Sequence, residues 1–269
     1  MRTLGIVGPD SGTLADRLVG RLDGRVALVR DDTRDEVAGG EATDCGVAAR
    51  RERAATTYEL GPDGWHAHGE ATSLEEVLDR LAPDHDYALV LDRPDARITQ
   101  VATGEAVEAV EAGLVVDPDG DLDDVVDLLE DVEPHETLES LVARVKRSPR
   151  ADRAGAIATV TGRVRAKDSA DDTPTQYLEF EKYEGVAERR MRELEAEFEE
   201  REGVLDVVMY HRTGVIPDGE DIVFVVVLAG HRREAFRTVE DGIDRLKEEV
   251  PIFKKEVTAE ETFWVHERD

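Results

Sequence analysis

The lysines of this sequence are the residues whose type and spacing could support a chemical reaction. The chain of 269 residues contains six lysines, and three of them, Lys247, Lys254 and Lys255, lie close together. Most of the remaining positive charge is carried by arginine. A lysine ammonium is compact and can lose its proton when it is desolvated, so it can act as a base or a nucleophile. The cluster predicts an amine-based site, with ordinary solvated lysines after a helix as the alternative.

Two His-Arg pairs at the ends of apolar runs could bind an anion. His231 and Arg232 follow the run 222–228 at the point where a helix begins, and the N-terminus of a helix favours negative charge. His211 and Arg212 close a second apolar run in the same way. Single histidines are more often structural than catalytic, but two such pairs favour an anionic ligand.

A glycine-rich turn near the N-terminus has the context of a phosphate-binding loop, because it stands between a strand and a helix. The full motif has four residues between its glycines and a lysine before its Ser or Thr. Here three residues separate Gly8 from Gly12, Thr13 follows directly, and no lysine precedes Lys146. We interpret Gly8, Ser11, Gly12 and Thr13 as a degenerate phosphate loop in a structural domain, because the cation for the phosphates is missing. Retained GTP or ATP binding, or an unrelated α/β domain, are the alternatives.

Strands alternate with helices in residues 1–132, which is typical of an α/β domain with a mainly parallel sheet. The segment 37–72 is weakly patterned, and we expect it to be rich in loops. Ser73 is the expected N-cap of a helix. The patterns predict strands at 3–7, 26–29, 87–91 and 114–116, and helices at 13–22, 72–81 and 121–132.

Pro134 marks a predicted boundary, and residues 134–269 have the pattern of an α+β domain. Arg163 and Arg165 end its first strand, and Pro251 stops its longest helix. The predicted helices are 137–146, 187–201 and 232–249, and the predicted strands are 156–164, 176–183, 204–210, 222–228, 253–258 and 263–266.

The composition excludes several classes of function. A formal net charge of −29, with 36% charged residues, indicates a solvated acidic surface that suits a halophilic cytoplasm and argues against nucleic-acid binding. The single cysteine, Cys45, is expected to be an idle thiol, since it allows no intrachain disulfide and no cysteine-based zinc site. The N-terminus lacks the apolar stretch of a signal peptide, and no apolar run is long enough to span a bilayer. We therefore expect a soluble cytoplasmic protein.

The region 137–269 resembles the large, catalytic subunit family of molybdopterin synthase, in the order and spacing of seven segments. Val160 and Phe253 stand where that family usually has Phe and Trp. The segments are Gly155–Ile157 with Thr161–Arg165, Leu178–Tyr183, His211–Gly214, His231–Phe236, Asp244–Lys247, Pro251–Glu256 and Trp264–Val265.

This resemblance implies a hammerhead-like α+β fold and a sulfurtransferase. Such an enzyme moves sulfur from the C-terminal thiocarboxylate of a small ubiquitin-like protein, which ends in Gly-Gly, to cyclic pyranopterin monophosphate. The product is the dithiolene of molybdopterin, and the step needs no metal or organic cofactor. The resemblance also implies a homodimer within a heterotetramer, with pockets that borrow residues across the dimer.

The resemblance further implies roles for individual residues. Lys247 would lie beside the donor's thiocarboxylate, and Lys254 would transfer a proton or hold an intermediate. The substrate's phosphate and pterin would be bound by Arg165, His231, Arg232 and Arg268. The alternative from a different class is a non-catalytic scaffold that binds ubiquitin-like proteins and guanylylation enzymes of the molybdenum cofactor.

The first half resembles the small P-loop adapter protein of molybdopterin-guanine dinucleotide biosynthesis. The resemblance lies in Gly8–Leu14 and in Tyr87–Leu91. An acidic-glycine signature would be expected after that second segment, and Asp92-Arg93-Pro94 stands in its place.

Overall fold

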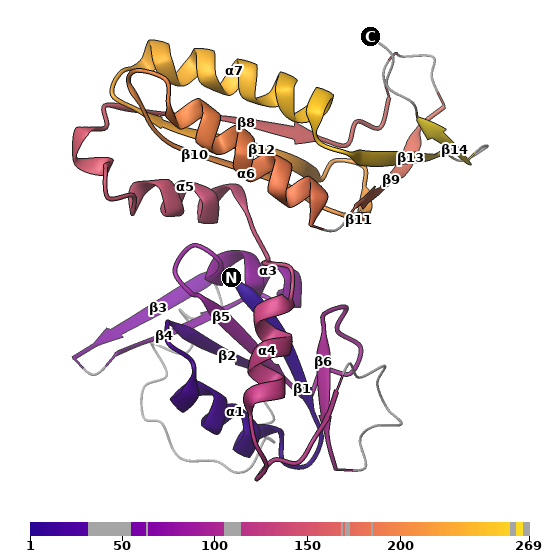
Figure 1. Ribbon diagram of the computed structural model, residues 1–269. Helices are drawn as coiled ribbons and strands as arrows, with labels where there is room; N and C mark the ends of the chain where they lie inside the picture. Colours follow the sequence, from indigo (N-terminus) through magenta and orange to yellow (C-terminus); the bar gives the residue numbers. More distant parts are fainter. Residues whose placement is uncertain are drawn as a thin grey trace. The chain divides into compact units, whose positions relative to one another are not determined.

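The computed structural model describes residues 1–31, 55–62, 64–104, 114–167, 169, 173–183 and 185–258, together with the backbone of 262–265. The chain divides into two compact units, Met1–His135 and Glu136–Asp269, and each is described here by itself (Figure 1). Cys45 and Arg268 lie outside the described residues, so the expectations for them are not tested. In the part of the chain that is described, no helix is both long and apolar enough to cross a membrane.

The first unit is built on a five-stranded sheet in the order β2-β5-β1-β6-β7. Every pairing in this sheet is parallel, which confirms the predicted α/β class. The strands are β1 (Arg2–Val7), β2 (Val26–Arg30), β5 (Tyr87–Leu91), β6 (Gln100–Thr103) and β7 (Leu114–Val116).

Helices cover both faces of this sheet, as a parallel sheet requires. Leucines of α1 (Ser11–Arg21) and α4 (Asp123–Asp131) pack in one core cluster with side chains of β1 and β5. Helix α3 (Leu74–Leu81) packs in a second cluster on alternate residues of β5. Ser73 caps α3 as predicted, because its side chain accepts the N–H of Glu76 in a capping box.

Two features of the first unit differ from the sequence expectation. The region 56–69, expected to be loop, forms a hairpin of β3 (Thr56–Gly61) and β4 (Gly64–Gly69). Strand β6 was also not predicted, since it has four residues, all buried, and so shows no alternation.

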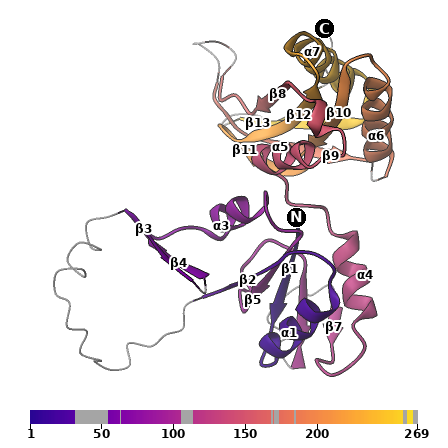
Figure 2. The same ribbon diagram turned by 90° about the vertical axis from the view of Figure 1, so that its left-hand side faces the viewer.

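The second unit contains a three-stranded antiparallel sheet in the order β10-β12-β8. Helices α6 (Val186–Glu199) and α7 (Arg232–Glu249) pack on one face, and α5 (Leu138–Lys146) packs on the other (Figure 2). The strands are β8 (Ala156–Arg163), β10 (Val204–His211) and β12 (Asp221–Ala229), and a 3-10 turn, η2 (Ala151–Arg153), precedes β8.

A second antiparallel sheet, in the order β11-β9-β13-β14, completes this unit and the α+β class. A small cluster of Val164, Leu178, Phe180 and Ile216 forms its core. Strand β11 was not predicted. The strands are β9 (Thr175–Lys182), β11 (Gly214–Pro217), β13 (Ile252–Thr258) and β14 (Thr262–Val265).

Helix α7 positions several of the predicted site residues. It buries Ala235, Val239 and Leu246 at helical spacing. Gly242 allows its close approach to the sheet, because a Cβ there would stand 3.0 Å from Val225 Cγ1. The helix ends at Glu249, just before Pro251, which lacks the N–H needed to continue it.

Candidate active site

The predicted site residues on α7 lie at its two ends. His231 is the N-cap and Arg232 the first helical residue, whereas Lys247 lies in the last turn. A helix of 18 residues is roughly 27 Å long at a rise of 1.5 Å per residue. A single chain therefore does not bring His231 and Arg232 together with Lys247.

Lys254 lies on the core side of β13. It is paired with Phe180 of β9, which is 5% exposed, and paired residues of antiparallel strands project to the same side. Lys255 projects to the opposite side and forms an ion pair of 2.7 Å with Glu179. The hydrogen bond to Glu179 raises the pKa of Lys255. The two adjacent lysines are both half-buried residues, but they project to opposite sides of β13, with Lys254 on the side of the core.

Lys182 joins Lys254 on this side of the sheet, and the sequence-based site did not include it. It is paired with Ile252, so it lies diagonally across from Lys254, at roughly 7–8 Å between backbones. Its side chain is 8% exposed and lies 3.1 Å from Glu188. Lysine is scarce in this chain, and this feature of the sequence could have drawn attention to Lys182.

Arg165 lies at the same end of the unit as Lys247 and Lys254. Val164, which precedes it, is buried in the small cluster with Phe180, and Ile252 packs against the same cluster. Ile252 also packs against the large cluster that contains Leu246, the neighbour of Lys247. The start of β8, by contrast, is paired with the end of β12, where His231 follows. The structure therefore groups Arg165, Lys247 and Lys254 at one end of the unit.

The other His-Arg pair, His211 and Arg212, makes contacts within the protein. His211 is 7% exposed, and its ring meets the ring of Phe180 edge-to-face at 4.9 Å. Its Nδ1 lies 2.7 Å from the carbonyl oxygen of Arg212. Arg212 itself donates to Glu220 and to the carbonyl of Asp221. This environment explains both residues without an anionic ligand.

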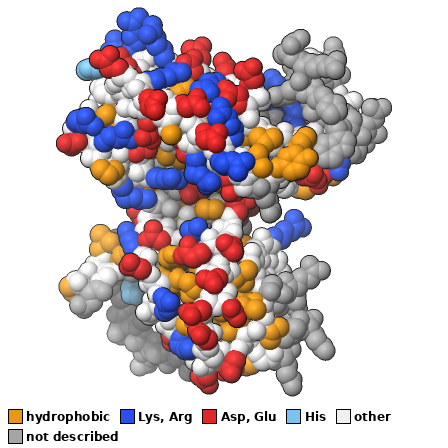
Figure 3. Space-filling view, viewed as in Figure 1, with side chains coloured by type: hydrophobic (Ala, Val, Ile, Leu, Met, Phe, Trp, Pro, Cys, Tyr) orange, Lys and Arg blue, Asp and Glu red, His pale blue; other side chains and the backbone are white. Residues whose placement is uncertain are grey.

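Positive charge is unevenly distributed between the two units. All six lysines and 22 of the 34 Lys and Arg residues follow His135. On the face shown in Figure 3, Lys and Arg side chains gather on the second unit, while Asp and Glu predominate on the first. The second unit therefore carries most of the positive charge of the chain.

The predicted phosphate loop has the expected local geometry. Gly8 follows β1, and Ser11, Gly12 and Thr13 form the first turn of α1. Gly8 has φ +131°, in the left-handed region that favours glycine. The sequence therefore located a strand-loop-helix junction correctly.

The chain is similar in sequence or structure to several known proteins. Residues 131–249 match the MoaE protein family. A probable molybdopterin synthase from Haloferax volcanii is 55% identical over 273 residues, covering 100% of both chains. The crystal structure of molybdopterin synthase from Staphylococcus aureus covers 50% of this chain and 93% of its own, at 31% identity and a TM-score of 0.44. The structure of Bacillus subtilis MobB covers 50% of this chain at 13% identity and a TM-score of 0.37.

The chain is thus a two-unit α/β protein, in which a unit with a parallel sheet is followed by an α+β unit that carries the candidate site residues. The chain belongs to the molybdopterin synthase family. It is a catalytic subunit, and the enzyme transfers sulfur in the biosynthesis of the molybdenum cofactor.

Proposed function

We propose that this catalytic subunit takes sulfur from the C-terminal thiocarboxylate of a small ubiquitin-like protein and places it on cyclic pyranopterin monophosphate. Lys247 stabilises the thiocarboxylate, and Lys254 transfers a proton or holds the intermediate. The observation that carries this proposal is the position of Lys254, on the core side of β13 and at the same end of the unit as Lys247 and Arg165. A lysine amine in contact with a bound substrate can serve as a base or a nucleophile.

The substrate and the donor tail are both anionic, so a basic site suits both. Arg165 lies on the lysine side of the unit, and we assign it to the substrate phosphate. His231 and Arg232 lie at the far end of α7, so we propose that a second copy of the chain supplies them. The proposed assembly is a homodimer with one small donor subunit at each end, in the cytoplasm. Arg268 is a further candidate for the substrate site.

Reconstitution with a thiocarboxylated donor and the pyranopterin precursor tests the proposal. We expect Lys247→Ala and Lys254→Ala to lower the rate of dithiolene formation by about 100-fold or more, as loss of an acid–base group does. Lys255→Ala is the matched control, because it removes an identical charge from the opposite side of the same strand. Its rate should remain within about 3-fold of the wild type.

The alternative scaffold makes a different prediction in the same assay. A scaffold would bind the donor protein, but the purified wild-type chain would yield no dithiolene. Equal activity in the Lys254→Ala and Lys255→Ala variants would remove Lys254 from the proposed chemistry. Circular dichroism of each variant separates a loss of chemistry from a loss of fold.

A further inference from the structure

The degenerate phosphate loop is contacted by a carboxylate of the same chain. Asp92 follows β5 directly, and β5 is the parallel neighbour of β1, so the loops after both strands lie at the same edge of the sheet. One oxygen of Asp92, Oδ1, accepts the backbone N–H of Gly8 at 3.2 Å. The other, Oδ2, accepts the Ser11 hydroxyl at 2.8 Å. In a phosphate-binding loop, backbone N–H groups cradle the phosphates and a hydroxyl faces the Mg²⁺ ion, so the carboxylate meets groups that such a loop directs toward its ligand.

The backbone around Asp92 holds the carboxylate in this position. Asp92 has φ +54°, and it is the one described residue other than glycine with a positive φ. Its N–H donates to the carbonyl of Ile6 at 2.9 Å, which ties it to β1. Gln100, 5% exposed, donates through Nε2 to the carbonyls of Pro94 at 3.3 Å and Ala96 at 2.7 Å. A buried amide thus anchors the turn that follows Asp92.

The opposite side of the loop is closed by β6. A Cβ on Gly8 would collide with the carbonyl oxygen of Thr103, so the loop lies directly against that strand. The Thr103 hydroxyl accepts the N–H of Asp10 at 3.4 Å, and the N–H of Ser11 donates to the carbonyl of Gly8 at 3.0 Å. The N–H groups of Gly8, Asp10 and Ser11 are therefore all hydrogen-bonded within the chain.

We propose that the Asp92 carboxylate occupies the position that a bound anion would take in this loop. The first unit therefore binds no nucleotide. A phosphate entering the loop would have to displace a carboxylate of like charge. It would also lack a lysine, since none precedes Lys146. The loop is then an internal hydrogen-bonding element that joins β1, β5 and α1.

Equilibrium dialysis and thermal unfolding of the full chain test this proposal. The wild type should retain no GTP with Mg²⁺ at millimolar concentration. Inorganic phosphate at millimolar concentration should leave its unfolding temperature unchanged, since the general stabilisation by excluded anions needs much higher concentrations. Asp92→Asn should lower the unfolding temperature of the first unit by about 3–6 °C, because one charged acceptor is lost. Asp95→Asn is the matched control, because Asp95 is exposed like Asp92 and lies three positions along the same loop, and this variant should behave as the wild type.

A second variant tests the anion position itself. Asp92→Gly removes the carboxylate, and glycine readily adopts the positive φ at this position. Inorganic phosphate should therefore stabilise this variant more than the wild type. Micromolar binding of GTP to the wild type would overturn the proposal. Equal phosphate responses in Asp92→Gly and the wild type, or equal stability of the Asp92→Asn and Asp95→Asn variants, would also overturn it.

Discussion

Glu195 of α6 is a residue whose charge the fold disfavours. Burial raises its pKa to about 7, and the charges of Glu199 and Asp206 act in the same direction. The N–H of Met209, at 2.7 Å, and the charge of Arg144 oppose the shift. Met209 belongs to β10, the edge strand of its sheet, so Glu195 satisfies a backbone donor that has no neighbouring strand.

We expect Glu195→Gln to stabilise the second unit at alkaline pH. The folded pKa, about 7, lies above the ordinary value of 4.5, so the wild type loses stability as pH rises from 4.5 to 7. Glutamine keeps an acceptor for the Met209 N–H and removes the buried charge. Above pH 7 the variant should be more stable by on the order of 2 kcal/mol, and at pH 5 the difference should nearly vanish.

Urea unfolding at pH 5 and pH 8, followed by circular dichroism, measures this difference. Glu200→Gln is the matched control, because it removes the same charge from an exposed position at the end of the same helix. Parallel pH profiles for Glu195→Gln and the wild type would contradict the assignment of a buried, protonated carboxyl.

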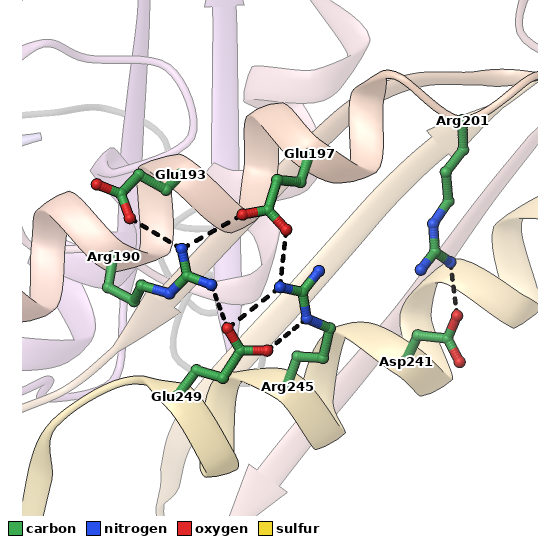
Figure 4. A network of polar contacts seen from close by, with 7 residues as sticks. All are labelled: Arg190, Glu193, Glu197, Arg201, Asp241, Arg245 and Glu249. Carbon is green, nitrogen blue, oxygen red and sulfur yellow. Dashed lines mark hydrogen bonds and ion pairs between the residues drawn. The ribbon is translucent and has the colours of Figure 1, made fainter.

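At the scale of elements, ion pairs join α6 to α7 (Figure 4). Glu249 accepts from Arg245 Nε at 2.5 Å and also pairs with Arg190. Arg245 and Arg190 both reach Glu197, at 2.7 and 3.3 Å. Arg201, which follows the C-cap of α6, and Asp241 of α7 form a separate pair of 2.6 Å. Glu249 belongs to the end of α7 that carries Lys247, so the network holds the segment from which Lys247 projects.

The network predicts a specific loss of stability in acid. Hydrogen bonds from Arg245 and then Arg190 lower the pKa of Glu249 to about 2, from 4.5. A lowered carboxyl pKa contributes stability above pH 4.5 that is lost as the pH falls toward 2. Glu249→Gln should therefore be less stable than the wild type at pH 6, and the difference should shrink as the pH approaches 2.

Urea midpoints between pH 6 and pH 2.5 measure this effect. Glu248→Gln, at the exposed neighbouring position, provides the control and should follow the wild type throughout. If the Glu249→Gln curve stayed parallel to the wild type down to pH 2.5, the ion pairs would not account for the helix contact. Molar salt should also reduce the difference, because exposed charges are screened.

At the scale of the whole molecule, the length of α7 decides how the site is assembled. His231 and Arg232 cannot reach Lys247 within one chain, so the proposed site needs two chains. In a mixed dimer of one Arg232→Ala chain and one Lys254→Ala chain, one of the two sites would contain both substitutions and the other site would contain neither.

Complementation between variants measures this arrangement. Each variant alone should be nearly inactive, and an equal mixture refolded together should recover about a quarter of wild-type activity, because half the dimers are mixed and each holds one intact site. A mixture of Lys247→Ala and Lys254→Ala chains is the control and should stay inactive, since both residues come from the same end of one chain. No recovery in the first mixture would refute a shared site.

The acidic surface predicts a dependence on salt that also belongs to the whole molecule. The net charge is −29, and it would repel the proposed anionic substrate at low ionic strength. The Debye length falls from about 10 Å at 0.1 M to about 3 Å at 1 M salt. We expect kcat/KM for sulfur transfer to rise with potassium chloride toward the molar range. A steady fall from low salt upward would contradict this expectation.

The sequence by itself determined the features that depend on near neighbours. The apolar spacing and Pro251 predicted α7 from 232 to 249, and Ser73 predicted the start of α3. The scarcity of lysine identified the cluster from Lys247 to Lys255 as the chemically unusual segment. These features could be predicted from the sequence because periodicity, capping and side-chain chemistry act over a few residues.

Tertiary structure alone decided the relations between distant residues. The register of β13 with β9 separates Lys254, against the core, from Lys255, paired with Glu179. The parallel pairing of β1 with β5 brings Asp92 to Gly8, 84 positions away. Strand pairing joins segments whose separation along the chain carries no local signal, so no pattern within one segment could have placed these side chains together.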